Sequence, residues 1–405
     1  MNVSEIKTWG DDVFPLLSWF DAKKVREAKV MVVGAGALGN EALKSLALFG
    51  VGDIVIVDFD TIEYSNLTRS ALFRAEDADK GLYKADTAAR RIRELNPNIR
   101  TLPINGDLLT DAGLGLYRRM DVVIGCLDSL HARVMLNRLC ARAGKTWIDG
   151  GIGNLEGQVS VYQPGVSCYE CNLTDDEKSA LYRRNPCAGV VMMNEKEGRA
   201  PTTPVIASLI AAIQVQEAMK YIHPELLKAG KFSTLAGKMF AYEGMYPSVD
   251  IFEFVARRQD CTAHEYWDTV VEIPELSAAA TVAQALSIIR QTLQTDTVEI
   301  NLRNDKFVDR IASRSENRCF SPMLPASKIP DYILAREEMN YLQTVEGFYQ
   351  HDFENIDGSF PYQALTLQQI GLPPLDVLQV TTDKGLFYVE LTNDIKLYEP
   401  LASTC

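Results

Sequence analysis

The sequence predicts an α/β protein built on a doubly wound parallel sheet, with a smaller α+β domain after it. Short apolar strands alternate with helical patterns along the first part of the chain, which is typical of parallel sheets covered by crossover helices. A glycine-rich loop, Gly34-Ala35-Gly36-Ala37-Leu38-Gly39, follows the first strand and opens a helix. After Asp268 the alternation stops, and a helix is followed by several strands. These observations indicate a Rossmann-like first domain and a boundary near residues 268–275.

The elements of the first domain are expected from local patterns. Residues 1–24 are expected to form a helical lead-in, which contains Trp9 and Trp19. Apolar runs predict strands at 29–33, 53–57, 122–125 and 146–148, and helical patterns lead up to residue 49 and cover 129–143 and 204–222. Residues 156–163 alternate with period two and predict a strand of a different kind. An irregular, cysteine-bearing segment spans 165–204, and hairpin-like strands occupy 238–257.

Composition indicates a folded chain of more than one domain. Its 405 residues exceed one ordinary domain of about 150 residues. Hydrophobic residues make up 47% and charged residues 23%, so burial can offset the entropy of ordering. A formal net charge of −13 argues against nucleic-acid binding as the main function. Residues 271–405 hold 19 acidic and 10 basic side chains, which is typical of a solvated surface or of a docking face for a basic partner.

No segment of the sequence predicts export or membrane insertion. Residues 1–12 are polar and lack the apolar core of a secretory signal. The apolar run at 205–213 is too short to span a bilayer, so we expect a buried helix there. Eight cysteines without an export signal are more typical of metal ligands or nucleophiles than of disulfides. We therefore expect a cytoplasmic protein that does not bind membranes.

The glycine loop predicts a phosphate site. A GxGxxG between a strand and a helix places backbone N–H groups and a helix N-terminus against a phosphate. Asp58 ends the next strand, the position expected of a carboxylate that bonds a ribose hydroxyl. Taken alone, Gly34, Gly36, Gly39 and Asp58 leave dinucleotide and ATP binding open, and a tight turn without a ligand is also compatible with them.

Charged residues beyond Asp58 favour a triphosphate. Asn66 and Arg69 follow the second strand, and Lys84 comes 15 residues after Arg69. Two cations near one glycine loop suit the β- and γ-phosphates, although each alone is more often a surface charge. Asp128 follows the strand at 122–125, at the edge of the sheet where ligands bind, and its carboxylate suits Mg²⁺.

Together these motifs resemble the ubiquitin-activating enzyme family, which includes the bacterial adenylyltransferases of sulfur carriers. The resemblance covers most of residues 25–260 and identifies 25–268 as an ATP-binding adenylation domain. It rests on five motifs in the family's order, namely 34–39, Asp58-Phe59-Asp60-Thr61-Ile62, Ser65-Asn66-Leu67-Thr68-Arg69, Lys84, and Leu127-Asp128 with Arg133 and Asn137. It implies adenylation of a protein C-terminal glycine with ATP and Mg²⁺. In that reaction Asp58 would hold the ribose, Asn66, Arg69 and Lys84 the phosphates, and Asp128 the magnesium.

One feature departs from the family pattern. The family usually carries an arginine before the glycine loop that serves the nucleotide of the partner subunit. The matching stretch, Thr8-Trp9-Gly10-Asp11-Asp12-Val13-Phe14, has no arginine, although Lys7 is near. We expect either another residue to replace it or a separate chain to supply it.

Two short motifs predict a structural zinc site. Cys168-Tyr169-Glu170-Cys171 is a CxxC pair and Cys261-Thr262-Ala263-His264 is a CxxH pair. Three cysteines and one histidine form a tetrahedral ligand set of structural type. The alternative is a solvated His264 and a small buried Cys261. The family often has two CxxC pairs at these locations, so the resemblance favours Zn²⁺ with histidine in place of the last cysteine.

Cys187 is a candidate nucleophile. It lies in the polar stretch Arg183-Arg184-Asn185-Pro186-Cys187, where the arginines favour a thiolate. Composition alone favours an ordinary loop cysteine. In the ubiquitin-type activating enzymes, however, a catalytic cysteine follows the CxxC at about this distance and accepts the carrier as a thioester. The resemblance also identifies 194–204 as the crossover segment after that cysteine.

Residues 272–405 resemble the ubiquitin-fold domain that ends eukaryotic activating enzymes. The expected elements are a helix at 281–293 and strands at 297–302, 377–381 and 386–391, which fit an α+β β-grasp. Residues 320–360 match less well and are expected to be an insertion. The resemblance implies recruitment of a conjugating enzyme, with Glu346, Asp352, Glu354 and Asp357 attracting a basic helix. An unrelated α+β appendage is the alternative.

The whole sequence is interpreted as an activating enzyme for a ubiquitin-like protein. The expected sequence of steps is ATP-dependent adenylation, a thioester on Cys187 and transfer to a conjugating enzyme. Alternatives are a sulfur-carrier adenylyltransferase without a thioester and an inactive scaffold subunit of a heterodimer. In an NAD-dependent dehydrogenase, the third alternative, Arg69, Lys84 and Asp128 would stand at these positions by chance. A single adenylation unit suggests a homodimer, with a heterodimer as the alternative.

Overall fold

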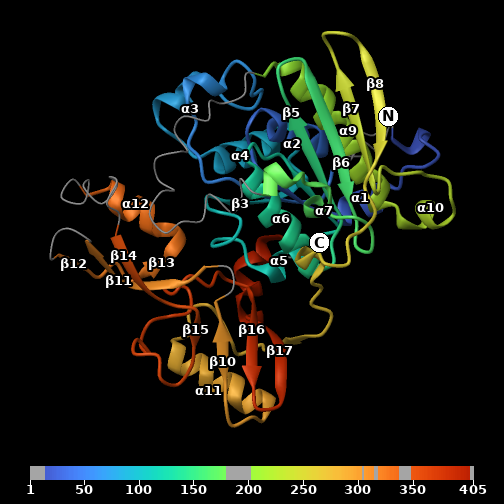
Figure 1. Ribbon diagram of the computed structural model, residues 1–405. Helices are drawn as coiled ribbons and strands as arrows, with labels where there is room; N and C mark the ends of the chain where they lie inside the picture. The colour runs from blue at the N-terminus through green and yellow to red at the C-terminus, as the bar shows by residue number, and fades with distance from the viewer. Residues whose placement is uncertain (1–13, 179–201, 303–304, 314–317, 337–347, 402–405) are drawn as a thin grey trace, which may run out of the picture.

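The computed structural model describes residues 14–178, 202–302, 305–313, 318–336 and 348–401. Three sheets, of eight, five and four strands, organise this part of the chain. The eight-stranded sheet and its helices form the upper part of the molecule in Figure 1, and the two smaller sheets lie below and beside it.

The large sheet is parallel in its first part and antiparallel in its last. Strands β1 to β5 pair in parallel, whereas β6, β7 and β8 continue the sheet as antiparallel neighbours. The predicted period-two strand is β6, and it is indeed of a different kind because it begins the antiparallel part. In spatial order the strands are β3 (Arg100–Ile104), β2 (Asp53–Val57), β1 (Lys29–Val33), β4 (Val122–Gly125), β5 (Trp147–Ile152), β6 (Glu156–Tyr162), β7 (Lys238–Glu243) and β8 (Ser248–Glu253).

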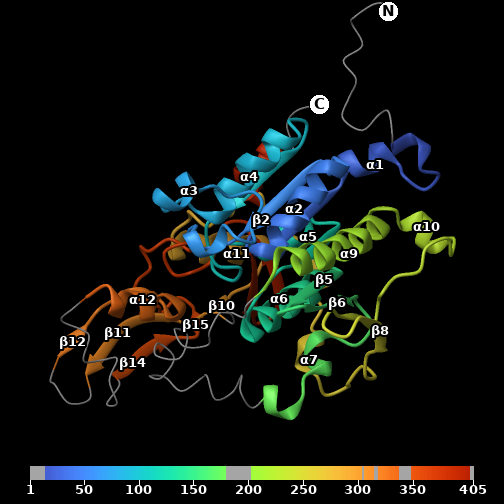
Figure 2. The same cartoon turned by 90° about the horizontal axis from the view of Figure 1, so that it is seen from above.

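Helices cover both faces of this sheet, as Figure 2 shows from above. Val30 and Val32 of β1 pack into one core with α2 (Ala37–Phe49), α4 (Lys84–Leu95) and α9 (Pro204–Ile222). Met31 and Val33 face the opposite core with α5 (Leu114–Arg118) and α6 (Leu130–Ala143). Alternate side chains of one strand therefore enter two cores, which is the packing of a doubly wound sheet. The predicted fold class is confirmed.

Smaller elements complete this part of the chain. The lead-in contains a 3₁₀ turn at Phe14–Leu16 and the helix α1, and the residues before Phe14 lie outside the described ranges. The other short helices are α1 (Ala22–Glu27), α3 (Ala75–Asp79), α7 (Tyr169–Asn172) and α10 (Pro224–Lys228), with 3₁₀ turns η2 (Tyr64–Asn66) and η4 (Thr262–His264).

Helix α9 is long and apolar enough to cross a membrane by length and composition, with 56% of its apolar window buried. Ile206, Ile210 and Val215 belong to the core beneath α2, so the helix is an internal element of the fold. The predicted buried helix at 204–222 is confirmed.

The sequence did not predict α4 and β3. Strand β3 contains Arg100, Thr101 and Pro103, and all of its residues are only half-buried. It lies at the edge of the sheet, where proline is tolerated because one side of the strand needs no partner. An edge strand needs no continuous apolar run, so the pattern that revealed β1 and β2 is absent here.

The five-stranded sheet belongs to the C-terminal part of the chain. Strand β9 (Val270–Glu272) pairs in parallel with β17 (Gly385–Glu390), whereas β10 (Glu299–Asn301), β15 (Asn355–Ile356) and β16 (Val377–Thr382) pair antiparallel. Helix α11 (Val282–Leu293) packs Val282, Leu286 and Ile289 into the core of this sheet. A helix on a mixed sheet is the α+β arrangement that the sequence predicts, although β10 is shorter than expected.

The stretch that is expected to be an insertion, residues 320–360, contributes strands to a sheet of its own. Strand β11 (Phe307–Ser313) pairs with β12 (Cys319–Phe320), β13 (Leu324–Pro325) and β14 (Phe348–Phe353). With α12 (Ile329–Leu334) it encloses a separate small core. This unit stands between β10 and β15 along the chain, as an insertion does, and it begins earlier than residue 320.

The large α/β part and the C-terminal part share a core. Leu375 and Val377 pack with the residues of α5 and α6, and the Trp267 and Tyr388 rings stack with centroids 4.4 Å apart. The Leu114 backbone N–H donates to Asp376 Oδ1 at 2.9 Å. These contacts fix the C-terminal sheet against α5 and α6.

The acidic residues expected to attract a partner are largely engaged within the protein. Lys306 Nζ lies 3.6 Å from Asp352 and 2.5 Å from Glu354. Asp357 accepts hydrogen bonds from Ser359, and these bonds lower the pKa of its carboxyl. Glu346 lies outside the described residues. The net negative charge of this acidic cluster is therefore smaller than its sequence suggests, because Lys306 neutralises part of it.

Candidate functional site

The parallel strands end together at one edge of the large sheet. The register pairs Val33 with Val57 and Gly125, and Val57 with Ile104. Backbone hydrogen bonds extend this alignment by one residue, from Gly34 N–H to the Val57 carbonyl at 2.8 Å and from Asp58 N–H to the Ile104 carbonyl at 3.1 Å. The glycine loop, Asp58 and the turn with Asp128 therefore leave the sheet side by side.

The three glycines of the loop meet different structural constraints. Gly34 has φ +96°, and a Cβ there would lie 2.3 Å from the Cys126 carbonyl oxygen. A Cβ on Gly39 would lie 2.0 Å from the Gly34 carbonyl oxygen. Gly36 has nothing within 4 Å of its Cβ position, and it precedes α2 without a side-chain cap. Gly36 thus leaves open space beside the N-terminus of α2, as a phosphate site requires.

Asn40 holds this loop in place, and the sequence did not single it out. Its side chain is fully buried, and Nδ2 donates to the carbonyls of Ala35 at 2.7 Å and Gly36 at 3.0 Å. Its Oδ1 accepts from the Leu72 N–H at 2.9 Å. One amide therefore joins the glycine loop to the loop that carries Arg69. Its place directly after the last glycine of the motif is the only signal in the sequence.

Asp58, Asp60 and Lys84 form a charged network beside the glycine loop. Asp58 Oδ2 accepts from the Ala35 N–H at 2.6 Å, and Oδ1 accepts from the Asp60 N–H at 2.8 Å. Burial raises the pKa of Asp58, and the charge of Lys84 opposes this shift. Lys84 Nζ lies 2.5 Å from Asp60 Oδ2. The structure thus brings Asp58 and Lys84 together, with Asp60 as a partner that the sequence reasoning did not assign.

Asn66 and Arg69 lie on the turn after β2. Asn66 is buried, and its Oδ1 accepts from the Glu63 N–H at 2.9 Å. Arg69 Nη1 donates to the Ser65 carbonyl at 3.0 Å. Both side chains are therefore fixed by contacts within their own turn, which Asn40 links to the glycine loop through Leu72.

Asp128 is exposed on the turn that follows β4. Arg133, nearby on α6, donates to the Leu127 carbonyl at 2.6 Å and contacts Asp149 at 3.1 Å. Burial would lower the pKa of Arg133, but the Asp149 carboxylate outweighs burial and raises it. A half-buried, charged arginine thus shapes the turn, while the Asp128 carboxylate stays accessible to a cation.

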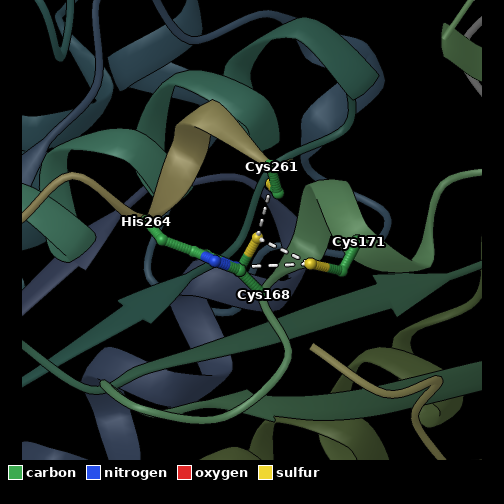
Figure 3. A group of neighbouring side chains, drawn as sticks. All are labelled: Cys168, Cys171, Cys261 and His264. Atoms are coloured by element: carbon green, nitrogen blue, oxygen red, sulfur yellow. Dashed lines mark hydrogen bonds between the residues drawn. The ribbon is translucent and has the colours of Figure 1, made fainter. Parts of the chain in front are cut away.

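The predicted zinc ligands converge although 93 residues separate the two motifs (Figure 3). Cys168 Sγ lies 3.8 Å from Cys171 Sγ and 3.7 Å from Cys261 Sγ. His264 Nε2 lies 3.3 Å from Cys171 Sγ. Tetrahedral zinc with bonds of about 2.3 Å to sulfur requires sulfur atoms roughly 3.8 Å apart. The four side chains therefore fit a structural zinc ion.

Neighbouring residues support this cluster. Asn137 of α6 accepts from the Tyr169 N–H at 3.1 Å, so α6 positions the CxxC turn. Burial would raise the pKa of Cys171, but N–H donors led by that of Arg258 hold it below its usual value. Arg257 Nε lies 2.9 Å from His264 Nδ1. A thiolate at Cys171 suits metal binding, whereas Nδ1 of a ligand histidine normally donates, so Arg257 would move when a metal binds Nε2.

Comparison with known proteins identifies the family. The model of the ThiF family matches residues 6–263, well over half of the chain. The chain belongs to the ThiF family. Its relatives are ThiF/MoeB-type adenylation enzymes, which include ubiquitin-like activating enzymes and sulfur-carrier adenylyltransferases, as the sequence motifs predict.

Individual ThiF-family relatives differ in how much of their length the chain spans. Molybdopterin-synthase adenylyltransferase of Escherichia coli is 35% identical over 230 residues, which are 56% of this chain and 83% of that protein. Adenylyltransferase and sulfurtransferase MOCS3 of Sus scrofa is 29% identical over 65% of this chain and 54% of its own length. SUMO-activating enzyme subunit uba-2 of Caenorhabditis elegans is 37% identical over 38% of this chain, but only 27% of its own length.

Some predicted features of this ThiF-family chain lie outside the described residues. They are Cys187, most of the crossover segment, and the stretch before Phe14 that lacks the expected arginine. Cys126 is half-buried, and desolvation raises the pKa of its thiol. Cys319 is exposed on β12, in the separate four-stranded sheet. Neither cysteine lies on the glycine loop or in the metal cluster.

Proposed function

We propose that this protein adenylates the C-terminal glycine of a ubiquitin-like protein, using ATP and Mg²⁺. The observation that carries the proposal is the single edge of a ThiF-family sheet that combines an open glycine loop with Asp58, Lys84 and Asp128. A helix N-terminus with open space beside it and a lysine suit phosphates, and the two carboxylates suit a ribose and a cation.

The proposed reaction is the transfer of an adenylyl group from ATP to a carboxylate. A carboxylate oxygen of the glycine attacks the α-phosphorus of ATP, and the bond from that phosphorus to the bridging oxygen of the β-phosphate breaks. Pyrophosphate leaves with the bonding electrons, and an acyl-adenylate remains. Lys84, Arg69 and the α2 N–H groups stabilise the phosphate charges, and Asn66 contributes an amide. Mg²⁺ held by Asp128 would neutralise the leaving group.

We further propose a second step on Cys187. Its thiolate attacks the acyl carbon of the adenylate, AMP leaves, and a thioester forms. The thioester then passes to a conjugating enzyme held by residues 272–405, the segment that resembles a ubiquitin-fold domain. In this scheme Zn²⁺ on Cys168, Cys171, Cys261 and His264 is structural. The protein works as a cytoplasmic homodimer, with a heterodimer as the alternative.

One experiment separates the two steps. Purified protein, ATP and candidate ubiquitin-like carriers are assayed for carrier-dependent ATP–pyrophosphate exchange, and the same mixtures are run on non-reducing gels. Adenylation predicts exchange, and the thioester predicts a thiol-sensitive adduct that Cys187→Ala loses. Absence of exchange with every carrier and partner chain would overturn the proposal and favour an inactive scaffold.

A sulfur-carrier adenylyltransferase is the second candidate. The observation in its favour is that the chain matches 83% of the length of the Escherichia coli adenylyltransferase. It predicts that Cys187→Ala retains full exchange and that wild-type protein forms no thiol-sensitive adduct.

A further inference from the structure

Lys84 is a nearly buried cation, and among the described residues Asp60 is the carboxylate that forms an ion pair with it. The residue is 9% exposed, and its ammonium lies 2.5 Å from Asp60 Oδ2. The Asp60 side chain is half-exposed. A buried ammonium requires a counter-ion, because desolvation without one costs several kcal/mol.

The position of Lys84 on its helix increases this requirement. Lys84 is the first residue of α4, and Tyr83 before it provides no side-chain cap. The N-terminus of a helix carries a partial positive charge, so a cation there is unfavourable by itself. Asp60 therefore compensates for both burial and the helix end.

The backbone fixes Asp60 in this place. The Lys84 N–H donates to the Asp60 carbonyl at 2.9 Å, and the Ile62 N–H donates to the Leu82 carbonyl at 2.8 Å. The Asp60 N–H in turn donates to Asp58, which accepts from the glycine loop. The carboxylate, the lysine and the glycine loop thus belong to one hydrogen-bonded unit.

We propose that Asp60 is a positioning residue that occupies the Lys84 ammonium until a triphosphate takes its place. This inference rests on the proposed function, because it assumes that Lys84 binds phosphate. A carboxylate and a phosphate are both anions that bind an ammonium through oxygen, so they compete for Lys84. Asp60 lowers nucleotide affinity by this competition, and it holds the Lys84 ammonium in the orientation that the reaction requires.

The test measures binding of a non-hydrolysable ATP analogue with Mg²⁺ by calorimetry. Asp60→Asn removes the competing charge, so the dissociation constant should fall by roughly two- to fivefold. In the exchange assay the same variant should lower KM for ATP and also lower kcat, because the freed lysine is less well oriented. A thermal melt verifies that the variant is folded.

Asp86→Asn is the matched control. Asp86 lies in the first turn of the same helix, but its carboxylate accepts from Asn105 at 2.6 Å rather than pairing with Lys84. Asp86→Asn removes the same formal charge close to Lys84 but leaves the Lys84–Asp60 ion pair intact. The dissociation constant of the analogue should therefore stay unchanged. An equal gain of affinity in both variants would mean that net charge alone acts, and would overturn the inference.

A double-mutant cycle with Lys84→Met tests whether Asp60 acts through the lysine. In the Lys84→Met background, Asp60→Asn should have no effect on binding of the analogue. If Asp60→Asn in the wild-type background weakened binding of the analogue, Asp60 would instead be assigned to the Mg²⁺ bound with the nucleotide. That result would overturn this inference but not the proposed function. If the wild-type protein binds no analogue at all, the proposed function fails, and this inference fails with it.

Discussion

Gly34 and Gly36 stand two positions apart in the loop but meet different constraints. Gly34 has a positive φ and touches the Cys126 carbonyl, so a side chain there strains the fold. Gly36 has φ −72° and open space around its Cβ position. A methyl group at residue 36 is therefore compatible with the fold, but it occupies the space in which a phosphate would lie.

This contrast predicts that Gly36→Ala folds normally and fails to bind ATP. Its melting temperature should stay within about 2 °C of wild type, because surface changes rarely exceed roughly 0.5 kcal/mol. Calorimetry with an ATP analogue measures the loss of binding. Gly34→Ala is the comparison, and it should be destabilised by about 1–3 kcal/mol. Normal ATP binding by Gly36→Ala would contradict the assignment of the phosphate site.

Asp376 predicts a pH dependence of stability. Burial raises the pKa of this carboxyl to about 6 from 3.8. Its protonated form therefore stabilises the fold fully below pH 3.8, and this contribution is lost as the pH rises through about 6. The shift corresponds to about 3 kcal/mol in free energy of unfolding at neutral pH.

Asp376→Asn tests this dependence. The asparagine Oδ1 can still accept from the Leu114 N–H, so the joint keeps its hydrogen bond. Urea unfolding of both proteins from pH 4.5 to 8 should show the variant gaining stability relative to wild type as the pH rises. A constant difference across that range would show that Asp376 does not titrate near pH 6.

At the scale of elements, the Cys₃His cluster joins two short segments to each other. Helix α7 has four residues and η4 has three, and both are too short to be stable alone. Among the described residues, the buried core between them is the small group Cys168, Cys171 and Ala263. Metal binding would therefore supply much of the stability of this region.

Cys261→Ser should lose bound zinc and local stability. We expect close to one zinc per chain in wild-type protein by elemental analysis, little in the variant, and a lower melting temperature. Cys319→Ser is the control, because Cys319 is exposed on β12. Equal zinc content in wild type and Cys261→Ser would contradict the ligand assignment.

At the scale of the whole molecule, one buried carboxylate joins the C-terminal part to the large α/β part. Glu390 on β17 is fully buried and pairs with Arg118 and with Arg119, whose Nη2 lies 2.7 Å from it. Gly113 and Gly115 allow the Pro374–Leu375 backbone to approach, because a Cβ on either would lie within 2.4 Å of a carbonyl oxygen. The two parts are therefore docked by charge and by close backbone contact.

Glu390→Gln should loosen this joint. Removing the charge leaves two arginines without their buried partner, which typically costs about 3–5 kcal/mol. We expect easier proteolysis between residues 268 and 275 and a larger radius of gyration by small-angle scattering. Glu272→Gln is the control, because Glu272 is half-exposed and lies 3.8 Å from Arg118. A Glu390→Gln protein as compact as wild type would show that apolar contacts alone dock the C-terminal part.

Local sequence patterns were sufficient to predict an element wherever its segment has a regular apolar pattern and is buried. Strands β1, β2 and β4 begin and end where the apolar runs do, and helix α9 has the bounds of the helical pattern at 204–222. The two cysteine motifs were also visible, because CxxC and CxxH spacings are local. The edge strand β3 was missed because it lacks such a run.

The sequence by itself determined the doubly wound fold, the glycine loop and the metal-ligand motifs, because each is written in residues close together along the chain. Only the tertiary structure decided the partners of Asn40, Asp60 and Glu390. Asn40 bonds to Leu72 and Asp60 pairs with Lys84, while Glu390 reaches Arg118, which is 272 residues away. These side chains carry no periodic signal, and their roles follow from which charge or amide the folded chain places against them.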